Sequence, residues 1–201
     1  MSSLTDSSAI FQYHRDMINA HGQRSSLALG WRDRDSQLIR FEALASIADL
    51  NGCTVLDAGC GHADLLSYLQ SDYPNLAGYC GVEQIPELLD KAIERYDGLP
   101  GISFISGSFM ARTLPVTDYV FASGSLNYNS VDINFIFKAI AKLYSGCTKG
   151  LGFNLLCKVP FAGFLAAYDI EEIMTYCRTL SSNVILKTGY ADEDFTVMLY
   201  R

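Results

Sequence analysis

The chain has 201 residues, of which 49% are hydrophobic and 18% are charged, and its net charge is −7. This composition predicts a single globular domain over residues 1–201 and excludes a disordered or fibrous chain. The acidic balance disfavours a nucleic-acid partner, which normally requires a basic face. No apolar run reaches the length of a membrane span, and residues 1–6 lack the pattern of a signal peptide. We therefore expect a cytoplasmic protein.

The cysteines give no sign of a metal site. They are scattered, with no Cys-x-x-Cys pair and no neighbouring histidine pair, at positions 53, 60, 80, 147, 157 and 177. In a reducing compartment this spacing favours buried free thiols over a zinc site. We predict no metal centre.

Two amphipathic helices are predicted ahead of the first strand. Apolar residues at helical spacing indicate the first over about residues 8–21, and Gly22 ends it. The same pattern indicates the second over about residues 35–50, where Asp35 or Ser36 can cap its start.

The segment that begins at Thr54 predicts a strand, a sharp turn and a helix. A short apolar run indicates a buried strand, which Asp57, Gly59, Gly61 and an amphipathic helix through Leu69 follow. Glycines let the backbone approach a ligand closely, and the free N–H groups at the helix start point into the same crevice. The pattern predicts a nucleotide site, although glycines that serve turn geometry alone would give the same pattern.

The spacing of the two glycines indicates which nucleotide binds. A dinucleotide-binding turn has the pattern G-x-G-x-x-G/A, and its sixth position is here Asp64, an acid where a pyrophosphate would need close approach. A P-loop is also excluded, because this segment has no Gly-Lys-Ser/Thr sequence. An acid two residues ahead of Gly59 suits a ligand that bears a cationic amine.

A second strand is predicted over residues 76–82, and it ends in an acid. Glu83 lies 22 residues past Gly61, and Pro86 suits the first turn of a helix that continues to Tyr96. A carboxylate at this strand end can accept two hydrogen bonds from a ribose diol. A lone glutamate at a helix start would otherwise serve as a cap or a dipole partner.

The rest of the chain continues to alternate strands and helices. Strands are predicted over residues 101–106, 116–123, 151–157, 184–187 and 195–200, and helices over residues 132–144 and 170–180. An apolar loop over residues 161–168 could wall an acceptor pocket or simply pack against the core. Polar side chains follow the fourth strand, where ligands bind in parallel sheets, although turn-forming residues alone would explain them: Ser123, Ser125, Asn127 and Tyr128.

The acid and the glycine turn resemble motif I of the class I S-adenosylmethionine (SAM)-dependent methyltransferases, an acid followed by G-x-G-x-G. Ala63 stands at the third glycine, and we expect it in the first helical turn, where φ is negative and alanine is tolerated. The resemblance implies an α/β fold, a Rossmann-like three-layer sandwich. Its seven-stranded sheet is mostly parallel, with an antiparallel last strand. Several short pairs look like a bacterial branch without assigned substrate: Gly30-Trp31, Ser36-Gln37 with Arg40-Phe41, Ser123-Gly124 with Asn127, and Phe153-Asn154.

The resemblance also implies a SAM site. Asp57 would meet the methionine amine, Ser108 would accept from the adenine amine where the family commonly has Asp, and Phe109 would flank the ring. The helices within residues 1–50 would cover the cofactor or acceptor, and Trp31 and Arg40 are candidates to contact it. Trp31 could instead be a buried core side chain, and Arg40 a surface charge. The predicted cofactor-binding residues are Asp57, Gly59, Cys60, Gly61, Glu83, Gln84, Ser108, Phe109, Ser123 and Arg40.

These features together predict a SAM-dependent methyltransferase that acts on a small-molecule acceptor by in-line displacement. A non-catalytic SAM-binding or scaffold domain is the alternative, and Asp64 disfavours a nucleotide-binding oxidoreductase. The [DN]-P-P-[YF] and Pro-Cys motifs of enzymes that methylate DNA bases are absent. A general base is optional. His14, His21 and Tyr13 are candidates that also suit structural roles, so no catalytic residue is assigned.

Overall fold

The computed structural model describes residues 4–22, 25–159 and 163–201, so positions 161 and 162 of the predicted apolar loop lie outside it. The elements follow in this order: α1 (Leu4–His21), the 3₁₀ helix η1 (Ser26–Leu29), α2 (Arg34–Ala45), β1 (Thr54–Ala58), α3 (Asp64–Asp72), β2 (Gly78–Glu83), α4 (Pro86–Tyr96), β3 (Ile102–Ser106), β4 (Thr117–Ala122), α5 (Phe135–Ser145), β5 (Cys147–Leu156), α6 (Ile170–Leu180), β6 (Val184–Lys187) and β7 (Asp194–Tyr200). Among the described residues, no helix is both long enough and apolar enough to cross a membrane.

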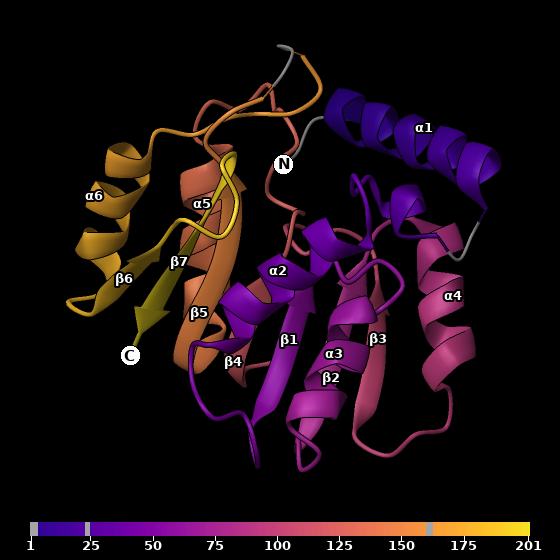
Figure 1. The fold of residues 1–201 in the computed structure, drawn as a ribbon, viewed down its shortest axis with the longest axis horizontal. Coiled ribbons are helices and arrows are strands. Elements are labelled where there is room, and N and C mark those ends of the chain that lie inside the picture. Colours follow the sequence, from indigo (N-terminus) through magenta and orange to yellow (C-terminus); the bar gives the residue numbers. More distant parts are fainter. Residues whose placement is uncertain (1–3, 23–24, 160–162) are drawn as a thin grey trace.

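The strands form one sheet in the order β3-β2-β1-β4-β5-β7-β6 (Figure 1). The first five strands in the chain pair in parallel, and β7 runs antiparallel to both β5 and β6. The predicted seven-stranded, mostly parallel sheet with an antiparallel last strand is therefore confirmed. Because β1 lies between β2 and β4, the strand order reverses at β1, the place where such sheets bind ligands.

Helices cover both faces of the sheet, which confirms the three-layer arrangement. Alternate residues of β1 point to opposite faces: Leu56 packs in the core with α5 and α6, and Val55 packs with α2, α3 and α4. Both side chains are fully buried. All six cysteines are free thiols, and only Cys157 is not fully buried.

The start and end of α2 differ from the prediction. Asp33 is the N-cap, and its Oδ1 accepts the Ser36 backbone N–H at 2.7 Å. The Ser36 hydroxyl in turn accepts the Asp33 N–H at 3.3 Å, so Ser36 takes part in a capping box from the third helical position and neither it nor Asp35 is the N-cap residue. The helix also ends at Ala45 and not near residue 50, since the Ser46 hydroxyl donates to the Ala43 carbonyl at 2.7 Å. The apolar pattern in the sequence continues past the C-terminal end of α2 because the turn that follows also buries apolar residues.

Helix α1 begins at Leu4, earlier than predicted, and lies across the carboxyl edge of the sheet (Figure 1). Arg15 of this helix forms an ion pair with Glu87 in the first turn of α4, with 2.9 Å between Nε and Oε1. Ile18 of α1 packs against Leu88, also from α4. These contacts hold α1 above the strand ends.

Candidate functional site

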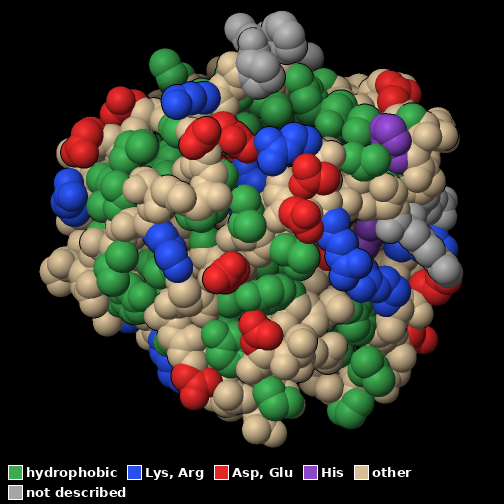
Figure 2. All heavy atoms as spheres, viewed as in Figure 1, with side chains coloured by type: hydrophobic (Ala, Val, Ile, Leu, Met, Phe, Trp, Pro, Cys, Tyr) green, Lys and Arg blue, Asp and Glu red, His purple; other side chains and the backbone are tan. Residues whose placement is uncertain are grey.

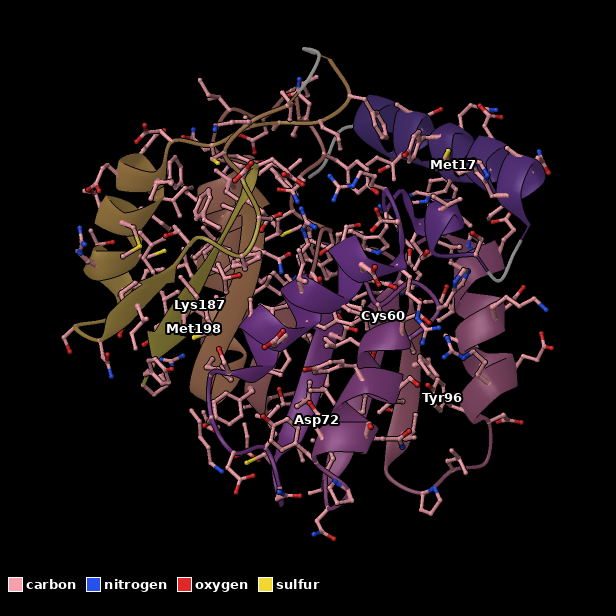
Figure 3. The ribbon with its side chains drawn as sticks, in the orientation of Figure 1. Met17, Cys60, Asp72, Tyr96, Lys187 and Met198 are labelled. Atoms are coloured by element: carbon pink, nitrogen blue, oxygen red, sulfur yellow. The ribbon has the colours of Figure 1, made fainter. Side chains whose placement is uncertain are left out.

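A cavity of about 570 Å³ lies at the carboxyl ends of β1, β2 and β4, with α1, η1 and α2 forming part of its wall. Its size falls within the range of small-molecule sites. Figure 3 labels Cys60, which marks the turn between β1 and α3 at this edge. All ten predicted cofactor-binding residues line the cavity: Asp57, Gly59, Cys60, Gly61, Glu83, Gln84, Ser108, Phe109, Ser123 and Arg40. Their role in cofactor binding stays a prediction.

The turn after β1 requires its glycines. Gly59 and Gly61 have φ angles of 84° and 54°, in the left-handed region that favours glycine. A Cβ on Gly59 would lie 2.4 Å from the Cβ of Ser125. The backbone N–H groups of Gly59 and Cys60 both donate to the Val82 carbonyl, at 2.8 and 3.1 Å. The turn is thus tied to β2 and packed against the segment after β4.

The expected conformation of Ala63 is wrong. Its φ is 58°, in the left-handed region, and it is the residue before the first turn of α3, not a member of that turn. Its N–H donates to the Cys60 carbonyl at 2.8 Å, so the chain makes another left-handed step before α3 begins. A side chain in this conformation costs roughly 1–2 kcal/mol, and the methyl group of Ala63 is fully buried in the core.

Glu83 joins the end of β2 to the glycine turn. One carboxylate oxygen accepts the Gly61 N–H at 2.9 Å, and the other accepts the Ile85 N–H at 2.8 Å. Burial raises the pKa of Glu83, and the backbone N–H groups of Ile85, Gly61 and Gln84 oppose that rise. A carboxylate has about four acceptor positions, so two hydrogen bonds leave capacity for a ligand in the cavity.

Asp57 is a buried carboxyl at the end of β1, with 2% of its surface exposed. Its Oδ2 accepts a hydrogen bond from the Tyr79 hydroxyl at 2.7 Å. Burial raises the pKa of Asp57 to about 7, the charges of Glu83 and Asp64 add to the rise, and the Tyr79 bond opposes it. The side chain therefore changes charge within the physiological pH range.

We expect the free energy of unfolding to depend on pH through Asp57. Its folded pKa, about 7, exceeds the unfolded value of about 4, so the contribution to stability is complete below the unfolded pKa and is lost as the pH rises through 7. Asp57→Asn lacks this pH-dependent contribution. Between pH 5 and pH 8 the free energy of unfolding of the wild type should therefore fall by about 2 kcal/mol more than that of the variant. Urea unfolding at both pH values measures it, with the exposed Asp90→Asn as control. Parallel pH profiles for wild type and Asp57→Asn would contradict this role.

The predicted adenine side of the cavity contains three polar groups and one ring. The Ser108 hydroxyl accepts the Met110 N–H at 3.2 Å, and Phe109 is buried against the core. Gln84 is partly exposed at the end of β2. The buried Oγ of Ser123 has no hydrogen-bond partner among the described residues, which leaves it available to a ligand.

Arg40 is a buried cation, not the surface charge of the alternative interpretation. Its Nε lies 2.8 Å from Oδ2 of Asp194, and its Nη2 lies 3.2 Å from Oε1 of Glu193. The guanidinium stacks 5.4 Å from the centre of the Trp31 ring, which lines the cavity and is partly exposed. Trp31 thus lies in the wall of the cavity and is not a buried core side chain.

Two of the three candidate bases reach the cavity, together with a tyrosine from the segment after β4. Tyr13 and His14 line it from α1, while His21 is exposed at the end of that helix, away from the cavity. Tyr128 lines the cavity beside His14, and its hydroxyl is 2.7 Å from Nε2 of His14. The other predicted polar residues, Ser125 and Asn127, line the cavity too.

Sequence reasoning missed several residues of the wall. Glu193 and Asp194 lie at the start of β7 or just before it, between the predicted strands over 184–187 and 195–200, and were not named as site residues; Leu29 of η1 was not considered either. Two adjacent acids at the start of an apolar strand were the available signal for a buried cation partner. Leu29 gave none, because an apolar residue ahead of the sheet has no distinguishing local pattern.

Charges of both signs are interspersed around the cavity. On the face in Figure 2, Lys and Arg side chains lie among Asp and Glu side chains, with no extended basic surface among the described residues of that face. Asp64, the residue that disfavours a pyrophosphate, accepts from Arg95 at 2.6 Å and from Gln37 at 3.2 Å.

Solved methyltransferase structures share this fold. Magnesium protoporphyrin IX methyltransferase (ChlM) from Synechocystis PCC 6803 with bound SAM has a TM-score of 0.71 at 16% identity, over 100% of this chain and 99% of that chain. A SAM-dependent methyltransferase from Aquifex aeolicus has a TM-score of 0.61 at 16% identity, over 82% and 92%. An O-methyltransferase family protein from Burkholderia thailandensis has a TM-score of 0.67 at 15% identity, over 94% and 63%.

Scans of the sequence against protein-family models and curated proteins give no match. The structural likeness nevertheless confirms the resemblance at the level of the fold: the chain has the architecture of the class I SAM-dependent methyltransferases.

Proposed function

We propose that the chain is a SAM-dependent methyltransferase with a small-molecule acceptor. The hydrogen bond from the Gly61 N–H to the Glu83 carboxylate carries the proposal. It places the glycine turn after β1 beside the acid that ends β2, and both line one cavity. A carboxylate in that place suits a ribose diol, and a glycine turn allows close approach of a ligand.

The cavity has the groups that SAM requires. The Asp57 carboxyl suits the methionine amine, Glu83 retains acceptor capacity for the ribose, and Ser108 with Phe109 suits the adenine ring. The Ser123 hydroxyl, which has no partner in the part of the chain that the structure describes, offers a further polar contact. Chains of similar fold have been crystallised with SAM or its demethylated product, S-adenosylhomocysteine (SAH), bound.

The acceptor would bind on the side formed by α1, η1 and Trp31. Bound SAM supplies a methyl group on a cationic sulfur, which is already a strong electrophile. The residues of this chain then need to align the acceptor in line with the methyl group and exclude water. A small acceptor is consistent with the size of the cavity, and the similar fold of the magnesium protoporphyrin IX methyltransferase supports it.

Calorimetry with SAM, SAH and NAD tests the proposal. We expect SAM and SAH to bind with micromolar dissociation constants, a free energy of about −8 kcal/mol, and NAD to bind far more weakly. Methyl transfer from labelled SAM into a metabolite extract then separates an enzyme from a scaffold domain. No SAM binding would overturn the proposal, and binding without transfer to any metabolite would favour the non-catalytic alternative.

We expect Ser108→Asp to tighten SAM binding by about five- to tenfold. A carboxylate accepts a hydrogen bond from the adenine amine about twice as strongly as a neutral hydroxyl does. The aspartate can also keep the bond that Ser108 accepts from the Met110 N–H. Calorimetric titration with SAM measures the change, and Ser108→Ala, which lacks an acceptor, should weaken binding. Equal affinities of the aspartate and alanine variants would show that this residue does not contact adenine.

A further inference from the structure

His14 and Tyr128 form a hydrogen-bonded pair across the acceptor side of the cavity. They lie 114 positions apart in the chain, yet Nε2 of His14 is 2.7 Å from the Tyr128 hydroxyl. Their rings meet edge to face, with centroids 5.8 Å apart. His14 comes from α1 and has 5% of its surface exposed, whereas Tyr128 comes from the segment after β4. Both line the cavity.

The partners of His14 assign the direction of this hydrogen bond. Nδ1 lies 3.0 Å from the Ala28 carbonyl oxygen, which can only accept, so Nδ1 carries the proton. Burial lowers the pKa of His14, although the Ala28 bond opposes the effect, so the ring is neutral near pH 7. A neutral ring with its proton on Nδ1 has a free lone pair on Nε2. The Tyr128 hydroxyl therefore donates to His14.

The Tyr128 oxygen keeps its own lone pairs for a ligand. Burial raises the pKa of Tyr128, so the hydroxyl remains protonated. The Tyr128 ring packs against Phe164, with 5.1 Å between the ring centroids. Phe164 in turn packs against Tyr13, with 4.5 Å between their centroids. The remaining wall on this side is largely apolar, from Ile10, Leu29, Trp31 and Leu165. The His14–Tyr128 pair is thus a hydrogen-bonding group surrounded by a largely apolar part of the cavity wall.

We propose that the methyl acceptor is a largely apolar molecule with a hydroxyl group, and that Tyr128 and His14 together take its proton. The inference rests on the proposed function. As the acceptor oxygen forms its bond to the methyl group, the sulfur–methyl bond breaks and its electron pair stays on sulfur. The acceptor proton passes to the Tyr128 oxygen, and the tyrosine proton passes to Nε2 of His14. The positive charge thereby moves from sulfur to the His14 imidazolium, whose Nδ1–H is hydrogen-bonded to the Ala28 carbonyl. His14 then releases the proton to solvent.

The titratable groups around the pair define its pH dependence. Tyr13 and Glu83 interact electrostatically with Tyr128, and His62 interacts with His14. Burial lowers the pKa of both histidines, so neither carries a proton at pH 7 that would repel the imidazolium as it forms. The rate with a weakly acidic acceptor should fall at low pH, as His14 becomes protonated and can no longer accept.

Labelled SAM with phenols of graded acidity tests the proposal. Phenol, whose hydroxyl is about as weakly acidic as that of tyrosine, needs a base, while 4-nitrophenol ionises close to neutral pH and does not. Tyr128→Phe should lower kcat with phenol by about 100-fold or more, the usual range of general-base catalysis, and change kcat with 4-nitrophenol far less. His14→Gln should act in the same direction. Tyr176→Phe on α6 and His21→Gln on α1 are matched controls outside the cavity.

Two results of the transfer assay would overturn the proposal. Equal losses with phenol and 4-nitrophenol would show that the pair only fastens α1 to the sheet. No transfer to any phenol by a wild-type protein that binds SAM would exclude a hydroxyl acceptor of this kind. Failure to bind SAM in calorimetry would instead contradict the proposed function. Independently of activity, nitrogen NMR at pH 7 should show His14 with a proton on Nδ1 and none on Nε2, and the opposite tautomer would overturn the assignment.

Discussion

Glu83→Gln is expected to weaken SAM binding by about 100-fold. The carboxylate accepts from Gly61 on one oxygen and from Ile85 on the other, at 2.9 and 2.8 Å. A glutamine amide has a single oxygen, so in either orientation its NH₂ group faces a backbone N–H and one of these bonds is lost. The amide also loses a charged acceptor for the ribose. Each hydrogen bond to a charged group contributes roughly 1.5–3 kcal/mol, and one or two lost bonds give a decrease of this size.

Calorimetric titration with SAM measures the effect of Glu83→Gln. The matched control is Glu171→Gln, at an exposed acid in the first turn of α6. Thermal unfolding with and without SAM gives a second readout, because a ligand raises the midpoint only as far as it binds the folded state. If a folded Glu83→Gln variant bound SAM with wild-type affinity, Glu83 would not contact the ligand. The proposed site would then lose its main support.

Arg40→Met is expected to lower the free energy of unfolding by about 3–5 kcal/mol, the usual cost of breaking a buried ion pair. The guanidinium side chain is 5% exposed and that of Asp194 is 1% exposed. Among the described residues, the variant would leave the Asp194 carboxylate with the Tyr190 hydroxyl as its side-chain donor, at 2.5 Å. Burial already raises the pKa of Asp194. Without Arg40 the carboxyl should take up a proton, so the loss should be smaller at pH 5 than at pH 8.

Urea unfolding of three variants tests this pair. Arg40→Met should be the least stable, and Arg40→Met with Asp194→Asn should recover part of the loss, because asparagine is neutral and still accepts from Tyr190. Arg15→Met, at a half-exposed ion pair on α1, is the control and should cost about 1 kcal/mol or less. Equal stabilities of the single and the double variant would show that the buried charge of Asp194 does not cause the loss.

Local patterns predicted the fold and the residues that line the cavity at the ends of β1 and β2. Gly59, Gly61 and Glu83 belong to short strand–turn–helix units, whose spacing depends on backbone geometry within a few residues. Strand and helix alternation gave the sheet, and the resemblance gave its antiparallel last strand, which the topology confirms. Ala63 was predicted wrongly, although it is local, because the helix preference of alanine was given more weight than the left-handed turn.

The non-local contacts could not be predicted. Arg40 meets Asp194 across 154 positions, and His14 meets Tyr128 across 114. Neither partner has a neighbour in the sequence that indicates the other, and each pairing depends on how helices pack over the sheet. The sequence could therefore name Arg40, His14 and Tyr128 as candidates, but not Asp194, and it could not distinguish a wall residue from a core or surface one.

The origin of the two cavity walls in the chain has an evolutionary consequence. Ile10, Tyr13, His14, Leu29 and Trp31, which shape one wall, all precede the first strand, whereas the opposite wall is built from the ends of the sheet. If the first of these walls binds the acceptor, as we propose, substitutions in it should alter which molecules bind without disturbing strand pairing or the glycine turn. Under the proposed function, selection can diversify acceptor choice through residues 10–31, while the strands and the glycine turn remain under constraint for folding.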